Sequence, residues 1–341
     1  MTRTDPPGLD LDRLRAYLDA RRPGLVAGEL SADVVEGGRS NLTYVVGDGS
    51  SRWVVRRPPL GHVLPTAHDM GREFRVISGL HDTAVPVPEA LLLCEDEDVI
   101  GARFYVMSYV EGTPYRTAEE LTALGEDRTE AIAGRLVDTL VDLHAVDPAA
   151  VGLGDFGRPE GFLERQLRRW KKQLDGSRSR DLPGIEELHD RLAASVPESG
   201  KPSIIHGDYR LDNVLVDADD QVAAVLDWEM STLGDPLTDV ALLVAYAERD
   251  KVSLQMVSNA SSAPGYPSTD EVVARYAERS GRDVSKLDWY VSFAFFKLAV
   301  ILEGIYFRYT QGKTVGAGFE GIGAGVAPLV AHGNEILKEE K

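Results

Sequence analysis

The chain of 341 residues has little cysteine, no excess of positive charge and no low-complexity tract. Its single cysteine, Cys94, excludes a disulfide framework and a cysteine-rich zinc site within one chain. The 37 Lys and Arg residues against 55 Asp and Glu residues give a net charge of −18. A chain this acidic should not bind nucleic acid or an anionic membrane through its overall field, so we expect neither partner.

Long uncharged apolar runs are also missing. The most apolar segment, residues 289–307, is interrupted by Lys297 and Glu303, which favours a buried helix over a membrane span. The first ten residues contain no apolar stretch like that of a signal peptide. We therefore expect a soluble, cytoplasmic protein. Its length and its hydrophobic share of 43% allow a large core and favour two domains or two lobes.

Strand patterns dominate the first hundred residues, and helical patterns dominate the rest. Residues 34–46 are predicted to form a strand, a glycine turn and a second strand. Further strands are predicted at 52–56, 90–94 and 103–109, and helices at 9–20 and 70–80. Later helices are predicted at 129–144 and 162–174, followed by a hairpin over 213–227 and mostly helix from 236. We expect an α+β protein with a small antiparallel-β lobe, residues 1–108, and a larger helical lobe, residues 109–341.

The most informative motif is His206-Gly207-Asp208, followed by Asn213 and then by Asp227. This spacing matches the kinase pattern H-R-D-x-x-x-x-N with a later metal-binding Asp, except that Gly207 replaces Arg. Asp208 is the candidate base, which would accept a hydrogen bond from a substrate hydroxyl and orient it towards a γ-phosphate. Alone, Asp208 would be interpreted as a turn or capping residue, and only the two later residues favour catalysis.

Asn213 and Asp227 are the candidate magnesium ligands. Magnesium prefers oxygen donors and keeps several waters and substrate phosphates, so two side chains suffice. A turn residue beside a strand is the alternative for each of them. Trp228 and Glu229 stand where protein kinases have the Phe and Gly of D-F-G, which suggests an apolar support behind Asp227 and a segment that does not flip.

Several stretches together resemble the aminoglycoside phosphotransferase and choline kinase superfamily, which has a protein-kinase-like fold. The stretches are 206–213, 226–229 and 234–241. Three others, 54–59, 166–170 and 302–305, resemble the branch of that superfamily that is fused to acyl-CoA dehydrogenases. The resemblance implies a two-lobed fold and transfer of the γ-phosphate of ATP, with Mg²⁺, to a small-molecule hydroxyl.

Arg56 stands where protein kinases have a phosphate-binding lysine. Strand alternation places Val54 and Arg56 on one face and Arg57 on the other, so Arg56 is the candidate, with Glu73 as its partner. Arginine is permanently charged and binds phosphate through two N–H groups. An ordinary surface ion pair is the alternative.

Other nucleotide contacts are expected from the resemblance and from a glycine turn. Gly38, Ser40 and Asn41 could cover the phosphates, although a plain hairpin turn explains them nearly as well. The backbone groups of Ser108 and Val110 are expected to face adenine. His206 is expected to pack and orient, and Asp239 to hold the catalytic loop by hydrogen bonds.

A basic segment, residues 162–180, bears on the acceptor. It holds seven positive and two negative residues. Its apolar residues are spaced so that they should form one inward-facing stripe of the helix: Leu163, Leu167, Trp170 and Leu174. The basic side chains form either a solvated face or a surface for an anionic acceptor such as an acyl-CoA thioester. A polycationic aminoglycoside would instead prefer carboxylates. A non-catalytic nucleotide-binding module is a further alternative, whereas no Ala-Pro-Glu segment of a protein kinase is recognisable.

Overall fold

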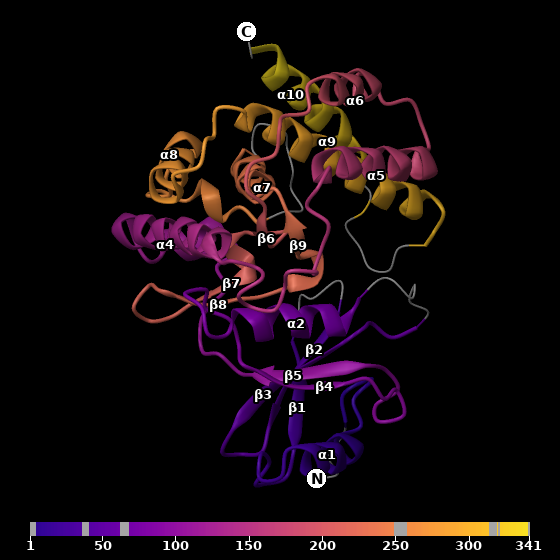
Figure 1. The fold of residues 1–341 in the computed structure, drawn as a ribbon. Helices are drawn as coiled ribbons and strands as arrows, with labels where there is room; N and C mark the ends of the chain where they lie inside the picture. Colours follow the sequence, from indigo (N-terminus) through magenta and orange to yellow (C-terminus); the bar gives the residue numbers. More distant parts are fainter. Residues whose placement is uncertain are drawn as a thin grey trace. The chain divides into compact units, whose positions relative to one another are not determined.

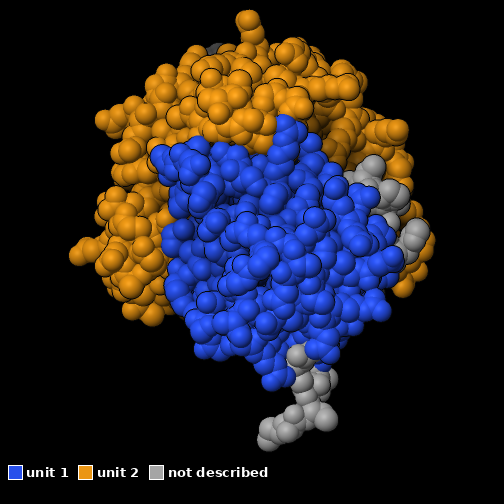
Figure 2. All heavy atoms as spheres, turned by 60° about the horizontal axis from the view of Figure 1, so that its bottom comes forward, with its two compact units in different colours: residues 1–112, 223–231 blue, residues 113–222, 232–341 orange. Residues whose placement is uncertain are grey.

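The computed structural model of the protein describes residues 5–35, 41–61, 68–248, 258–313, 319 and 321–339. Its chain divides into two compact units (Figure 2). Unit 1 contains residues 1–112 and 223–231, and unit 2 contains residues 113–222 and 232–341. The sequence-based division after residue 108 stays a prediction.

A five-stranded antiparallel sheet, in the order β1-β2-β3-β5-β4, builds unit 1 (Figure 1). Its strands are β1 (Ser31–Val34), β2 (Leu42–Gly47), β3 (Arg52–Arg57), β4 (Ala90–Cys94) and β5 (Phe104–Ser108). The register pairs Val55 with Tyr44 on one side and with Val106 on the other. The predicted small antiparallel sheet is therefore confirmed.

Two helices lie on opposite faces of this sheet (Figure 1). Helix α1 (Leu11–Arg21) packs its buried leucines into a core that includes Tyr44, Val55 and Phe104. Helix α2 (Met70–Leu80) begins after Asp69, whose side chain accepts from the N–H of Arg72 at 3.1 Å and so caps the first turn. Alternate residues of β3 consequently face different helices.

Unit 2 is mostly helical (Figure 1). Its helices are α3 (Ala118–Thr122), α4 (Glu126–Ala145), α5 (Phe162–Ser177), α6 (Ile185–Ala194), α7 (Leu237–Ala247), α8 (Thr269–Ser280), α9 (Leu287–Thr310) and α10 (Val326–Glu339). Short strands β6 (Ser203–Ile205) and β9 (Thr232–Gly234) pair antiparallel in the same unit. The helices predicted at 129–144 and 162–174 are present, and together with the sheet they confirm the expected kinase-like α+β fold.

The chain after the predicted catalytic loop forms a short helical turn, η1 (Leu211–Asn213), and then strand β7 (Val214–Val216). The predicted turn follows, closed where the N–H of Asp217 donates to the carbonyl of Gln221 at 3.0 Å. Strand β8 (Val222–Val225) and the turn η2 (Trp228–Met230) then flank Asp227. Two more short turns are η4 (Ala260–Ser262) and η5 (Ile322–Gly325).

Helix α9 is the apolar segment identified in the sequence. Among the helices of the described residues, it alone is long and apolar enough to cross a membrane by length and composition. However, 72% of its apolar window is buried inside the protein, as in a core helix. Glu303 on this helix is fully buried and accepts hydrogen bonds from Ser179 and Arg180. The predicted buried helix is therefore present.

Candidate active site

The predicted catalytic loop follows the buried strand β6. Asp239, in the first turn of α7, accepts the main-chain N–H groups of His206 at 2.7 Å and of Gly207 at 2.8 Å. Gly207 has φ +86°, a backbone conformation that glycine adopts without strain. The loop is thus held through its main chain, which is the role predicted for Asp239.

The charge of Asp239 is maintained by its surroundings although the residue is completely buried. Burial opposes ionisation, but the hydrogen bond from His144 Nε2 at 3.2 Å and the N–H of His206 outweigh it, so the pKa of Asp239 lies below its usual value. An ionised carboxylate makes stronger hydrogen bonds than a neutral one. The two N–H bonds that fix the catalytic loop therefore gain strength.

The carboxylate of Asp208 is held at both oxygens and yet stays 29% exposed. Oδ1 accepts from the hydroxyl of Tyr246 at 2.9 Å, and Oδ2 accepts from Nδ2 of Asn213 at 3.2 Å. The same Nδ2 donates to the main-chain carbonyl of Asp208 at 2.9 Å. These bonds fix the amide of Asn213 so that its oxygen remains the atom suited to bind a cation.

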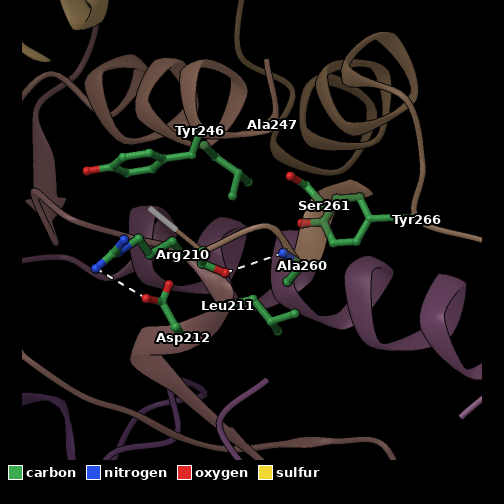
Figure 3. Close-up of a pocket in the computed structure, with 10 residues that line it drawn as sticks. Arg210, Leu211, Asp212, Tyr246, Ala247, Ala260, Ser261 and Tyr266 are labelled. Atoms are coloured by element: carbon green, nitrogen blue, oxygen red, sulfur yellow. Dashed lines mark hydrogen bonds and ion pairs between the residues drawn. The ribbon is translucent and has the colours of Figure 1, made fainter. Parts of the chain in front are cut away.

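Arg210 lines a small pocket (Figure 3) and also lies beside Asp208. Its Nε lies 3.5 Å from Asp208 Oδ2, its Nη2 lies 3.2 Å from Asp212 Oδ2, and its guanidinium carbon lies 5.2 Å from the ring centroid of Tyr246. Burial raises the pKa of Asp212, although Arg210 opposes the rise. The open centre of the pocket is about 20 Å³, which is room for roughly one water molecule.

Lys297, from the middle of α9, also reaches the catalytic loop. Its Nζ donates to the carbonyl of Gly207 at 3.1 Å and lies 5.7 Å from the ring centroid of Trp170. Burial lowers the pKa of Lys297, against the opposing effect of Asp208 and Asp239. In the sequence this lysine only interrupted an apolar run. Lysine is uncommon within such an apolar helical run unless it has a partner, which is the signal that could have identified it.

The basic segment around α5 provides fewer available cations than its sequence suggested. Lys171, Arg178 and Arg180 form ion pairs within unit 2, and Arg165 donates to two main-chain carbonyls. The remaining three, Arg168, Arg169 and Lys172, are exposed. The predicted apolar stripe of α5 is buried. The positive charge of Arg169 contributes to the lowered pKa of Lys297, after the larger effect of burial.

In unit 1, Arg56 and Glu73 form the predicted pair. Arg56 Nε lies 2.9 Å from Glu73 Oε2, and the same guanidinium donates to Asp227. Arg57 lies on the other face of the sheet, where it donates to the carbonyls of Gly8 at 2.6 Å and Ile100 at 2.9 Å. The assignment of the two arginines to opposite faces is therefore confirmed.

Asn41 closes a ring of polar side chains in unit 1. Its Nδ2 donates to Glu73 Oε1 and to Glu229 Oε2, each at 3.0 Å, while Tyr105 donates to Glu73 Oε2 at 3.0 Å. The ring runs from Arg56 through Glu73, Asn41 and the 227–229 segment back to Arg56. Burial raises the pKa of Glu73 to about 7, although Arg56 opposes the rise. Glu229 was not predicted to contact Asn41. Gly38 and Ser40 lie outside the described residues.

Asp227 has φ +65° and ψ +60°, a conformation that non-glycine residues adopt rarely and often at functional sites. The next residue, Trp228, is buried and donates from Nε1 to the carbonyl of Val225 at 3.0 Å, as expected of an apolar support. The oxygens of Asp227 and Asn213 are of the kind that magnesium prefers. The described residues contain no cluster of three or more His, Cys, Asp or Glu that could hold a metal, and magnesium bound by phosphates and water needs none.

The two residues expected to face adenine lie at the end of β5. The N–H of Ser108 donates to the carbonyl of Glu89 at 2.9 Å, and its hydroxyl accepts from the N–H of Glu89 at 2.8 Å. Val110 is half-buried two residues beyond the strand. Unit 1 thus contains Arg56, Glu73, Asn41, Ser108, Val110 and Asp227, and unit 2 contains Asp208 and Asn213.

Comparison with protein families gives a match to one described as the phosphotransferase enzyme family, over residues 31–283. Acyl-CoA dehydrogenase family member 11 of Rattus norvegicus is 35% identical over 313 residues, which is 89% of this chain and 40% of that relative. The chain therefore spans less than half the length of the curated relatives it matches.

Solved structures share the fold along nearly the whole chain. A proposed aminoglycoside phosphotransferase from Ralstonia eutropha is 33% identical with a TM-score of 0.85, covering 97% of this chain and 99% of its own. A mutant of aminoglycoside phosphotransferase APH(4)-Ia, in a ternary complex with AMP-PNP and hygromycin B, has 16% identity and a TM-score of 0.60 over 95% of this chain and 97% of its own. The second similarity concerns the fold alone.

Proposed function

The chain belongs to the phosphotransferase enzyme family, and we propose that it uses ATP and magnesium to phosphorylate a hydroxyl group of a small molecule. The carboxylate of Asp208 carries this proposal. It is partly exposed, its orientation is fixed by Tyr246 and Asn213, and its loop is anchored by Asp239. A base for phosphoryl transfer needs this combination of access and fixed orientation.

In the proposed reaction, Asp208 accepts a hydrogen bond from the acceptor hydroxyl and holds its oxygen in line with the γ-phosphorus. The new oxygen–phosphorus bond forms as the bond between the γ-phosphorus and the ADP oxygen breaks, and the hydroxyl proton passes to Asp208. Asn213 and Asp227 would hold magnesium, which offsets the negative charge of the phosphates when bound.

The nucleotide would be bound mainly by unit 1. Arg56, oriented by Glu73, supplies a guanidinium suited to two phosphate oxygens. Gly38, Ser40 and Asn41 remain the proposed residues over the phosphates, and the backbones of Ser108 and Val110 remain the proposed adenine contacts. The complex of APH(4)-Ia with AMP-PNP supports a nucleoside triphosphate as the donor.

For the acceptor we favour an anionic molecule resembling a hydroxyacyl-CoA. Arg210 and Lys297 flank the Asp208 loop, and Arg168, Arg169 and Lys172 are exposed on α5 in the same unit. These cations suit the phosphates of coenzyme A. The similarity to an acyl-CoA dehydrogenase family member supports the same class.

An aminoglycoside acceptor is the second candidate. The name of the Ralstonia eutropha structure, which is 33% identical, favours it. The cations beside Asp208 disfavour it, because an aminoglycoside is itself a polycation.

A transfer assay tests both candidates. The purified protein is given ATP and magnesium with 3-hydroxybutyryl-CoA, longer hydroxyacyl-CoA thioesters, the matching free hydroxy acids, and hygromycin B. We expect an acid-stable phosphoester on a thioester and none with the Asp208→Asn variant. Phosphorylation of hygromycin B alone would favour the second candidate. Nucleotide binding without any phosphorylated acceptor would instead support a non-catalytic nucleotide-binding module.

A further inference from the structure

One helix holds both the main chain and the side chain of the proposed base. Asp239, near the start of α7, binds the N–H groups of His206 and Gly207, and Tyr246, near its end, binds the carboxylate of Asp208. The two residues are seven positions apart, which is about two helical turns, so they project from the same face of α7. The helix therefore positions the loop at two points.

The bond between Tyr246 and Asp208 has a defined direction. Burial and the nearby charge of Asp208 raise the pKa of Tyr246 well above its usual value, so the hydroxyl keeps its proton and donates. The guanidinium of Arg210 lies over the ring of Tyr246, with its central carbon 5.2 Å from the ring centroid (Figure 3). That contact limits movement of the ring and keeps the hydroxyl aimed at Asp208 Oδ1.

The two oxygens of Asp208 consequently have different surroundings. Oδ2 accepts a hydrogen bond from Nδ2 of Asn213 and lies beside Arg210, whereas Oδ1 accepts a hydrogen bond from the hydroxyl of Tyr246. A carboxylate oxygen has more than one lone pair, so Oδ1 can accept a second hydrogen bond.

We propose that Tyr246 is a positioning residue for phosphoryl transfer, holding the carboxylate of Asp208 with Oδ1 directed at the acceptor hydroxyl. This inference rests on the proposed function of Asp208 as the base. It assigns to α7 a part in catalysis that the motif of residues 206–213 does not contain.

Tyr246→Phe removes the hydroxyl and keeps the ring against Arg210. With the best acceptor of the panel described above, we expect kcat to fall about 10-fold, because the orientation of the base loses one hydrogen bond to a charged group. The KM for ATP should stay unchanged, because Tyr246 acts on the orientation of Asp208 and not on the nucleotide.

Tyr266→Phe is the matched control, because it removes a hydroxyl from another tyrosine that lines the same small pocket. It should leave kcat as in the wild type. An unchanged kcat in Tyr246→Phe, or equal losses of kcat in both variants, would overturn the inference. A loss of kcat in Tyr246→Phe accompanied by a comparable rise in the KM for ATP would show a structural role only and would overturn it too. If the wild type phosphorylates no acceptor of the panel, the proposed function fails first and this inference with it.

Discussion

Lys297 donates a hydrogen bond to the carbonyl of Gly207 at 3.1 Å, across 90 positions of the sequence. The lysine comes from a mostly apolar and largely buried helix, and the glycine immediately precedes the proposed base Asp208. Partial burial lowers the pKa of this lysine, so keeping its ammonium charged at this position has a free-energy cost. Residues that reduce stability in this way are common at functional sites.

We therefore expect Lys297→Met to lower kcat by about 10-fold while the free energy of unfolding stays the same or increases slightly. Methionine preserves much of the apolar stem, and removing a partly buried ammonium removes its desolvation cost. Transfer assays and urea denaturation check the two effects. Lys338→Met, at an exposed position of α10, is the control and should change neither. A wild-type kcat in Lys297→Met would mean that the lysine serves only the packing of α9.

The variant Asp208→Asn tests the base itself. It preserves the shape of the side chain and removes its ability to take a proton, so kcat should fall by about 10²–10⁴-fold. Nucleotide affinity, measured by calorimetry, should be close to that of the wild type. Asp212→Asn is the comparison, because this nearby carboxylate forms an ion pair with Arg210 and accepts no hydrogen bond from Tyr246. The loss of kcat in Asp212→Asn should be far smaller. Comparable losses in the two variants would count against Asp208 as the base.

Sequence patterns predicted most of the framework and part of the site. Helix α2 has the predicted bounds because its apolar spacing is regular and Asp69 caps it. Helix α6 and the paired strands β6 and β9 were not predicted from the sequence. Each of the two strands has only three residues, which is too short to show a periodic pattern.

The roles of Asp208 and Asn213 could be proposed because they lie five residues apart in one motif. Tyr246 and Lys297 reach the same loop from 38 and 90 residues away along the chain. Nothing in a single sequence connects such distant residues, and neither belongs to a recognisable motif. Tertiary packing alone brings Tyr246 to Asp208 and Lys297 to Gly207.

The contact between Asn41 and Glu229 leads to a prediction for nucleotide binding. It joins residues 188 positions apart and links the start of β2 to the segment that carries Asp227. Glu229→Ala should raise the KM for ATP about 5–10-fold. The loss of one hydrogen bond of roughly 1 kcal/mol should loosen both Asn41, proposed to cover the phosphates, and Asp227, proposed to bind magnesium.

The control for this prediction is Glu229→Gln, which keeps an oxygen able to accept from Asn41 and should have a smaller effect. The acceptor KM should remain unchanged in both variants. An equal KM for ATP in Glu229→Ala and the wild type would show that the contact does not contribute to nucleotide binding.

Glu73 should make folding depend on pH. Burial raises its pKa to about 7 from an ordinary value of 4.5, so between these values the folded protein holds this proton more tightly than the unfolded chain. The contribution of Glu73 to the free energy of unfolding should therefore fall as pH rises from about 4.5 to about 7 and then level off. The fall is at most about 3 kcal/mol, since one pKa unit corresponds to about 1.36 kcal/mol.

Glu73→Gln isolates this effect, because glutamine has the same shape and does not titrate. Urea denaturation at pH 5 and pH 8, without nucleotide or magnesium, gives the difference in unfolding free energy between wild type and variant at each pH. The wild type should lose stability relative to Glu73→Gln between pH 5 and pH 8, whereas the exposed Glu89→Gln should show no such trend. A wild type that instead gains stability relative to Glu73→Gln would mean that the ion pair with Arg56 outweighs burial and keeps Glu73 ionised below its ordinary pKa.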